Sequence, residues 1–182
     1  MTASAVSDAK HPSPAIQGCL EACRRCRALV DAVIGRGDEL ERAVLRAIGP
    51  HLRHCIEHFQ CFFSGCESGV VDYEARERDE RLERDPAHFL AELAAATARL
   101  RSLDPSTART MAVRQEAAPG GQVRTVDTNV ERELLFLSSH TIHHLAIMTL
   151  LAERAGVEVP EKLGVAFSTA SWEERSGVHS GA

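Results

Sequence analysis

The sequence lacks the features that favour nucleic acid or a membrane as a partner. Its net charge is −5, from 21 Lys and Arg against 26 Asp and Glu, so there is no basic excess to attract a polyanion or an anionic surface. The most apolar stretch is interrupted by the polar run Ser138–His144, and we expect no apolar run of membrane-span length. We therefore expect neither nucleic acid nor a membrane as a partner.

The first 14 residues also lack a secretion signal, because they have neither a basic start nor an apolar core. A cytoplasmic location is the default expectation, and in a reducing cytosol the six cysteines are expected to be free thiols. We expect residues 1–12 to be disordered, residues 13–170 to form one domain, and residues 171–182 to form a tail in which Trp172 belongs to a packed irregular segment.

Apolar periodicity predicts a mainly all-α protein. The expected helices cover approximately residues 14–34, 38–66, 86–103 and 130–155, and Pro50 either ends or kinks the second of them. Residues 67–84 are rich in charge and are expected to connect the second and third helices. Before the last helix, two strand-like stretches flank Pro119-Gly120-Gly121, a pattern typical of a β-hairpin. The expected fold is a four-helix bundle with a small β-hairpin before the last helix.

The most informative residues are histidines inside the apolar last helix. His140, His143 and His144 form a polar island there, which costs free energy unless the side chains find partners. His140 and His144 are four residues apart and share one helix face. This spacing suits two imidazoles that bind one divalent metal ion.

A second histidine set lies on one face of the second expected helix and consists of His51, His54 and His58. Any one of these histidines alone is more simply explained as an ordinary hydrogen-bonded side chain. Together with the pair on the last helix, however, one of them would complete a site with three protein ligands. Such a site keeps an open position, as catalytic metal sites do.

The cysteines support a second hypothesis about function. Cys19, Cys23 and Cys26 follow the spacing C-x3-C-x2-C, which is typical of a metal or iron–sulfur site. They also lie on the apolar stripe of the first expected helix, which favours plain core packing. With the three other cysteines they leave open a non-enzymatic, thiol-rich protein that buffers soft metal ions, although methionine is scarce.

Further candidates lie near the histidines in the sequence. Glu133 precedes His140 by seven residues and shares its helix face, so it is a candidate acid/base group; alternatively, it is a carboxylate favoured by the helix dipole. Asp72, Tyr73 and Arg76 follow the second helix and are candidates for binding a substrate or cofactor. Arg76 suits a carboxylate group, although such charged runs are commonly solvated.

His54 in His-Leu-Arg-His54 and the His140-x3-His144 pair resemble the motif of the DinB/YfiT-like superfamily, which contains metal-binding four-helix bundles. The resemblance extends over residues 15–169 and implies that His54, His140 and His144 bind one divalent ion, such as zinc, nickel or iron. Neighbouring or alternative ligands would then be His51, His58 and His143.

The resemblance also implies a function class. Characterised members include thiol-dependent transferases and isomerases, and N-terminal domains of sulfoxide synthases. We expect no fused catalytic domain here, which argues against the synthase role. We therefore expect a metal-dependent transferase or hydrolase that acts on a small molecule with a low-molecular-weight thiol, and a homodimer. Many members have no known reaction. The cysteines leave metal buffering as one alternative, and a stress-related scaffold with a vestigial site is another.

Overall fold

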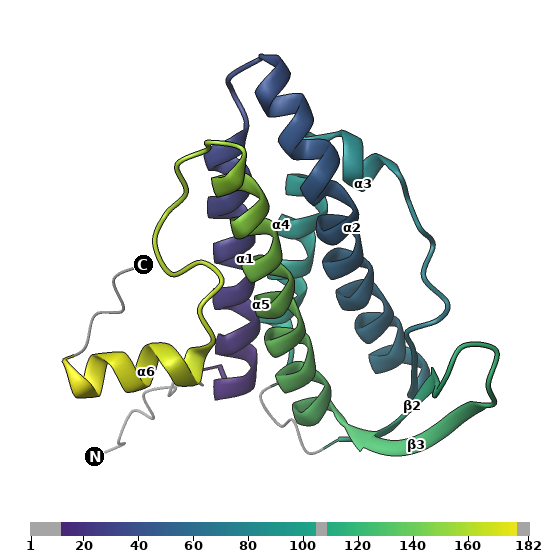
Figure 1. Ribbon diagram of the computed structural model, residues 1–182. Helices are drawn as coiled ribbons and strands as arrows, with labels where there is room; N and C mark the ends of the chain where they lie inside the picture. Colours follow the sequence, from purple (N-terminus) through teal and green to yellow (C-terminus); the bar gives the residue numbers. More distant parts are fainter. Residues whose placement is uncertain (1–11, 105–108, 178–182) are drawn as a thin grey trace, which may run out of the picture.

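Helices dominate the computed structural model, which describes residues 12–104 and 109–177 (Figure 1). The described helices are α1 (Pro14–Val33), α2 (Glu39–Ser68), α3 (Arg81–Arg84), α4 (Pro86–Ser102), α5 (Val130–Arg154) and α6 (Phe167–Ser176). The strands are β1 (Val70–Asp72), β2 (Thr110–Glu116) and β3 (Val123–Asn129). The prediction of a mainly helical protein is confirmed, whereas the disorder expected for residues 1–12 falls almost wholly outside the described residues.

Polar side chains define where the long helices begin. Each accepts a hydrogen bond from a backbone N–H of the first turn, which satisfies a donor that has no partner within the helix. These residues are Ser13 for α1, Asp38 for α2, Asp85 for α4 and Asn129 for α5. Proline at the first position of α1 and α4 supports the same boundaries, because its missing N–H is not needed there.

Helix α2 runs without interruption through Pro50. The alternative in which a separate helix ends near Ile48 is therefore wrong. Packing favours continuity here, because a Cβ on Gly49 would lie 2.5 Å from the carbonyl oxygen of Glu83. The glycine thus lets α3 approach α2 closely beside Pro50.

The core lies where the inner faces of α1, α2, α4 and α5 meet. Helix α5 contacts both α1 and α2, and α4 also contacts both (Figure 1). The largest side chains of this core are less than 2% exposed and include Ile16, Leu29, Ile48, Phe59, Phe62, Phe89, Leu100, Leu134 and Leu145. Each contributes roughly 1.5–3 kcal/mol relative to full exposure, so burial of these faces dominates the stability.

A small sheet lies at one end of the helices (Figure 1). β2 and β3 pair antiparallel, which confirms the predicted hairpin. β1 pairs parallel with β2, with Val71 opposite Val113. β1 lies in the segment expected to be a charged connection and could not be predicted there, because a three-residue strand has almost no periodicity and its partner is some 40 residues away. The strand carries the chain toward Tyr73.

The segment after α5 also differs from expectation. Trp172 lies on α6, 53% exposed, instead of in a packed irregular segment. The packed part is the chain that precedes α6. Arg25 of α1 donates hydrogen bonds to the carbonyl oxygens of Lys162 and Val165, both at 2.9 Å, and its guanidinium lies over the ring of Phe167. These contacts hold the segment against the helices.

Helix α5 differs from the expectation that no apolar run reaches the length of a membrane span. By length and composition it is apolar enough to cross a membrane, with a mean hydropathy of 1.4 over an 18-residue stretch. The same test is passed by core helices of proteins that never enter a bilayer, so it is weak support for a span. In this structure α5 packs against α1 and α2 along its inner face.

Candidate metal centre

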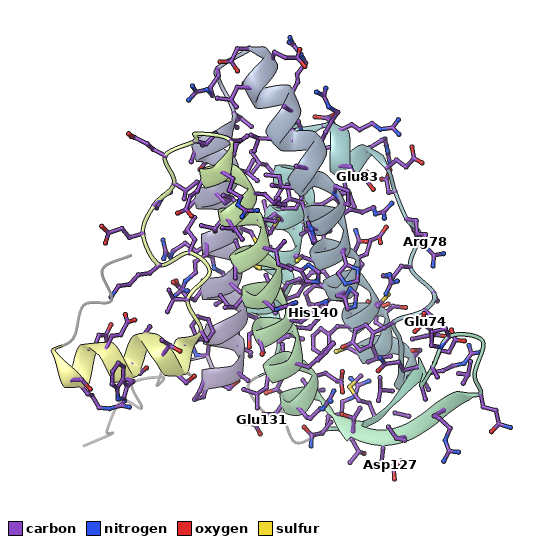
Figure 2. All side chains as sticks on the ribbon, in the orientation of Figure 1. Glu74, Arg78, Glu83, Asp127, Glu131 and His140 are labelled. Atoms are coloured by element: carbon purple, nitrogen blue, oxygen red, sulfur yellow. The ribbon has the colours of Figure 1, made fainter. Side chains whose placement is uncertain are left out.

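Five histidines meet where α5 faces α2. Neighbouring rings lie close together: the ring centroids of His54 and His58 are 4.2 Å apart, and those of His140 and His144 are 4.6 Å apart. Between the two helices, the centroids of His54 and His140 are 5.0 Å apart and those of His51 and His144 are 5.1 Å apart. Figure 2 shows His140 in the middle of the molecule. The helical spacing thus brings the His140 and His144 pair of α5 to the same place as the histidines of α2, as the sequence predicts.

Three of these histidines form a group suited to a metal ion. The ligand atoms of His54, His58 and His140 all lie within 4.8 Å of one another. The Nε2 atoms of His54 and His140 are 3.0 Å apart. Two nitrogen ligands of a tetrahedral zinc ion, each about 2.0–2.1 Å from it, are roughly 3.3 Å apart. Small side-chain adjustments would therefore bring the three nitrogens to one ion.

The tautomer of His58 suits metal binding. Its Nδ1 lies 2.8 Å from the backbone carbonyl oxygen of His54, which can only accept a hydrogen bond. Nδ1 therefore carries the proton, and in the neutral ring Nε2 is left with a free lone pair. Metal-binding histidines commonly hold their second nitrogen in this way, which fixes both tautomer and ring direction.

Burial keeps the imidazoles neutral. Burial, followed by the positive charge that neighbouring histidines and Arg76 would present, lowers the pKa of His54 to about 3. Burial is also the main reason that the pKa of His58 is lowered to about 4, although the hydrogen bond to the carbonyl oxygen of His54 acts in the opposite direction. Burial lowers the pKa of His140 as well, followed by the effects of His143 and Arg76. At neutral pH these rings are therefore deprotonated, which is the state that a metal ion requires.

His144 lies beside this group and not in its closest set. Its ring centroid is 4.7 Å from that of His54, and its Nδ1 is 2.9 Å from Nδ1 of His51. The predicted ligand set therefore shares two residues with the closest set, in which His58 takes the third place. Whether His144 binds the ion stays a prediction. His143 is exposed and lines a cavity of about 480 Å³ beside α6.

Glu133 is fully buried. Its carboxylate accepts hydrogen bonds from the hydroxyl of Tyr73 at 2.7 Å and that of Thr128 at 2.6 Å. The guanidinium of Arg132 lies 2.9 Å from the same carboxylate. With these partners and no exposed surface, Glu133 serves as an anchor in the first turn of α5, and its candidate role as an acid/base group has no support from this geometry.

The three other candidates, Asp72, Tyr73 and Arg76, lie in the segment after α2, and their role in binding a substrate or cofactor stays a prediction. Asp72 pairs with Arg114 at 2.7 Å, and Arg76 donates to the carbonyl oxygen of Tyr73 at 2.7 Å. Tyr73 is 3% exposed. Asp72 and Arg76 help to line a cavity of about 410 Å³, together with Cys61 and other residues, but none of its lining residues is a histidine. Arg78, farther along the segment, is exposed (Figure 2).

The cysteines are free, and those of the C-x3-C-x2-C motif are buried. Cys19 and its two motif partners are at most 2% exposed, which confirms the prediction of core packing. The thiol of Cys19 donates to the carbonyl oxygen of Leu134 at 3.1 Å and so joins α1 to α5. Burial raises the pKa of Cys23 and of Cys55 to about 12. Protonated thiols are poor metal ligands.

One residue of the site was missed in the sequence. The ring of Phe136 stacks on that of His140, with centroids 5.2 Å apart and planes at 23°. Phe136 precedes His140 by four residues, so the i, i+4 spacing was the available signal. Many apolar residues of this helix share that relation with another residue, which is why the signal did not stand out.

No family model, curated protein or solved structure matches this chain. Membership of the DinB/YfiT-like superfamily stays a prediction from the histidine motifs. Support for a function comes from the geometry of the histidine cluster.

Proposed function

We propose that this protein binds one divalent metal ion through His54, His58 and His140. The observation that carries the proposal is the convergence of their ligand atoms within 4.8 Å of one another, from two facing helices. Three imidazoles leave a fourth position for water or substrate, which is the arrangement of catalytic zinc sites. A metal-dependent enzyme that acts on a small molecule is therefore the function that fits best.

The chemistry of the donors limits the metal and the reaction. Imidazoles suit zinc, nickel and iron, which are the ions that we propose. A bound ion with an open position lowers the pKa of water or of a thiol that joins it, which is the chemistry of a hydrolase or a thiol transferase. A low-molecular-weight thiol is therefore the first co-substrate to screen. The buried thiols of α1 give no support to metal buffering.

We further propose that α1, α2, α4 and α5 form a four-helix bundle of the DinB/YfiT-like kind. Two contacts support this proposal: α5 packs against α1 and α2, and α4 packs against the same two helices. Metal sites in such bundles are built from inward side chains of facing helices, as α2 and α5 provide here. The resemblance places His144 among the ligands, whereas the geometry favours His58.

A zinc titration of the metal-free protein tests the proposal. We expect one ion per chain, with affinity reduced more than about 100-fold in His54→Ala and His140→Ala, because loss of a residue that merely supports a ligand already costs about 10–100-fold. His143→Ala is the matched control, since it removes an exposed histidine of the same helix. Unchanged zinc affinity in His54→Ala would refute the site.

The same titration separates the two ligand sets. If His58 is the third ligand, His58→Ala weakens zinc binding far more than His144→Ala does. The reverse order would support the ligand set implied by the resemblance and would leave the metal-binding function standing.

A further inference from the structure

Tyr73 is held at two places. Its hydroxyl donates to the carboxylate of Glu133 at 2.7 Å, and its ring stacks on that of His58, with centroids 5.1 Å apart and planes at 21°. The side chain is almost fully buried, so few alternative positions are open to it. Tyr73 thus connects a fixed carboxylate to one of the proposed metal ligands.

The carboxylate of Glu133 is a firm anchor. A buried carboxylate is unfavourable unless its oxygens are satisfied, and here Thr128, Arg132 and Tyr73 supply the partners. Its place in the first turn of α5 also puts the negative charge near the positive end of the helix dipole. Because Thr128 belongs to β3 and Tyr73 follows β1, the anchor joins the small sheet to α5.

Phe136 lies against a second proposed ligand, His140, as Tyr73 lies against His58. It stacks on His140 at 23°, and its ring centroid lies 5.3 Å from that of Tyr73. Two imidazoles of the proposed site therefore each lie against an aromatic ring, and the two aromatic rings contact each other. For His144, in contrast, the ring contacts found within residues 12–104 and 109–177 are all with other histidines.

The direction of a metal bond depends on the ring plane, because the lone pair of Nε2 lies in that plane. A stacked aromatic ring restricts the plane, and the hydrogen bond from Nδ1 of His58 to the carbonyl oxygen of His54 restricts it further. A ligand held in its binding orientation loses less conformational freedom when the ion arrives. The stacked rings therefore favour the set that contains His58.

We propose that Tyr73, anchored by Glu133, is a positioning residue that orients His58 for metal binding, and that Phe136 does the same for His140. This inference rests on the proposed function, since it assigns a role to residues that support the metal ligands. Tyr73 acts through His58 and does not itself contact the ion.

The test uses the full chain, freed of metal and titrated with Zn²⁺ and, separately, with Co²⁺. Tyr73→Leu removes both the stack and the hydroxyl, and we expect zinc affinity to fall about 10- to 100-fold, as for other residues that support metal ligands. The visible absorption spectrum of the Co²⁺ form should also change, because it reports the geometry of the ligands. Tyr73→Phe keeps the ring, so its loss of zinc affinity should be smaller than that of Tyr73→Leu.

Variants of the anchor provide a conservative rescue. Glu133→Gln keeps an oxygen that accepts a hydrogen bond from the hydroxyl of Tyr73, so its zinc affinity should stay close to that of the wild-type protein. Glu133→Ala removes this acceptor, and its zinc affinity should fall about 10- to 100-fold, as in Tyr73→Leu. Phe89→Leu is the control for packing, because it reduces a buried aromatic residue of α4 that makes no ring contact with the five histidines. It should lower the melting temperature and leave zinc affinity unchanged.

Circular dichroism confirms that each variant is folded at the temperature of titration, and Tyr73→Phe with Glu133→Gln remain informative if a larger change unfolds the chain. Wild-type affinity and an unchanged Co²⁺ spectrum in Tyr73→Leu would overturn the inference and leave the metal site intact. Equal losses in Phe89→Leu and Tyr73→Leu would also overturn it. Failure of the wild-type protein to bind either ion would instead overturn the proposed function.

Discussion

The histidine cluster between α2 and α5 and the cysteine motif of α1 both have the spacing of metal ligands, yet the structure gives them opposite chemistry. The motif cysteines are at most 2% exposed, whereas His54 and His140 are half-buried beside each other. Burial raises the pKa of Cys23 to about 12 and lowers that of His54 to about 3. Burial disfavours the charged form in both cases.

The consequences differ because the ligand forms differ in charge. A thiol binds metal as an anion, so burial keeps it protonated and makes it part of the apolar core. An imidazole binds metal as a neutral group, so burial keeps its lone pair free. The same loss of hydration therefore disfavours metal binding by the cysteine motif and favours metal binding by the histidine cluster.

The largest effect expected from this comparison is on thermal stability. A ligand that binds only the folded state stabilises it by about 4.1 kcal/mol when its concentration is 1,000 times its Kd. Zinc should therefore raise the melting temperature of the wild-type protein by several degrees, and His140→Ala should abolish the gain. Differential scanning fluorimetry with and without a chelator measures both, and an equal gain in the variant would contradict the histidine site.

A change in the cysteine motif should act on stability alone. Cys26→Ser places a hydroxyl in the core and should reduce the free energy of unfolding by about 1–3 kcal/mol, more than Cys26→Ala does. Urea unfolding measures this loss. The stabilisation by zinc should be the same as in wild-type protein, and a smaller zinc effect in Cys26→Ser would show that the thiols take part in binding.

The pH dependence should be smaller. The pKa of His58 is lowered to about 4 and that of His54 to about 3, against about 6.5 in the unfolded chain. Below pH 6.5 the unfolded chain therefore binds more protons, and the metal-free protein loses stability as the pH falls from 7 toward these values. Proton linkage limits the loss between pH 7 and pH 6 to about 0.7 kcal/mol for each ring, and solvent screening reduces the loss for the half-buried His54.

Urea unfolding of the metal-free protein at pH 7, 6 and 5 measures this slope, and His54→Ala should reduce it. A stability that stays constant over this range would show that the rings are charged or solvated in the folded state. It would remove the central contrast with the thiols.

The smallest effect should appear in thiol labelling. Cys61 and Cys66 are half-buried, so they should react with a thiol reagent before the four buried cysteines do. Burial raises the pKa of Cys61 to about 11, so labelling is slow at pH 7 and should be followed near pH 9. Zinc should leave the rates of both nearly unchanged. A rapidly labelled Cys23 that zinc protects would reverse the assignment of the two motifs.

Local signals explain what the sequence could predict of the fold. Asp85-Pro86 and Asn129 mark helix starts through hydrogen bonds within one turn, and Pro119-Gly120-Gly121 marks the hairpin. β1 and the course of α2 through Pro50 depend on contacts with distant segments, so they could not be read locally. The periodicity of α6 is weak because Trp172 and most of its neighbours are exposed.

The candidate site divides in the same way. His54 and His140 could be predicted because helical spacing fixes the face from which each projects. The third member could not, because the choice between His58 and His144 depends on ring orientation. Tyr73 stacks on His58, whereas His51 is hydrogen-bonded to His144, and neither contact follows from helical spacing because each joins α2 to a segment outside that helix.

X-ray absorption at the zinc edge of the protein loaded with one equivalent of zinc tests the central claim most directly. It reports the ligand atoms and thus compares the two motifs in one measurement. We predict a shell of imidazole nitrogens at about 2.0–2.1 Å, with no sulfur shell. A sulfur shell at about 2.3 Å would show that the cysteines bind the ion and would contradict the account.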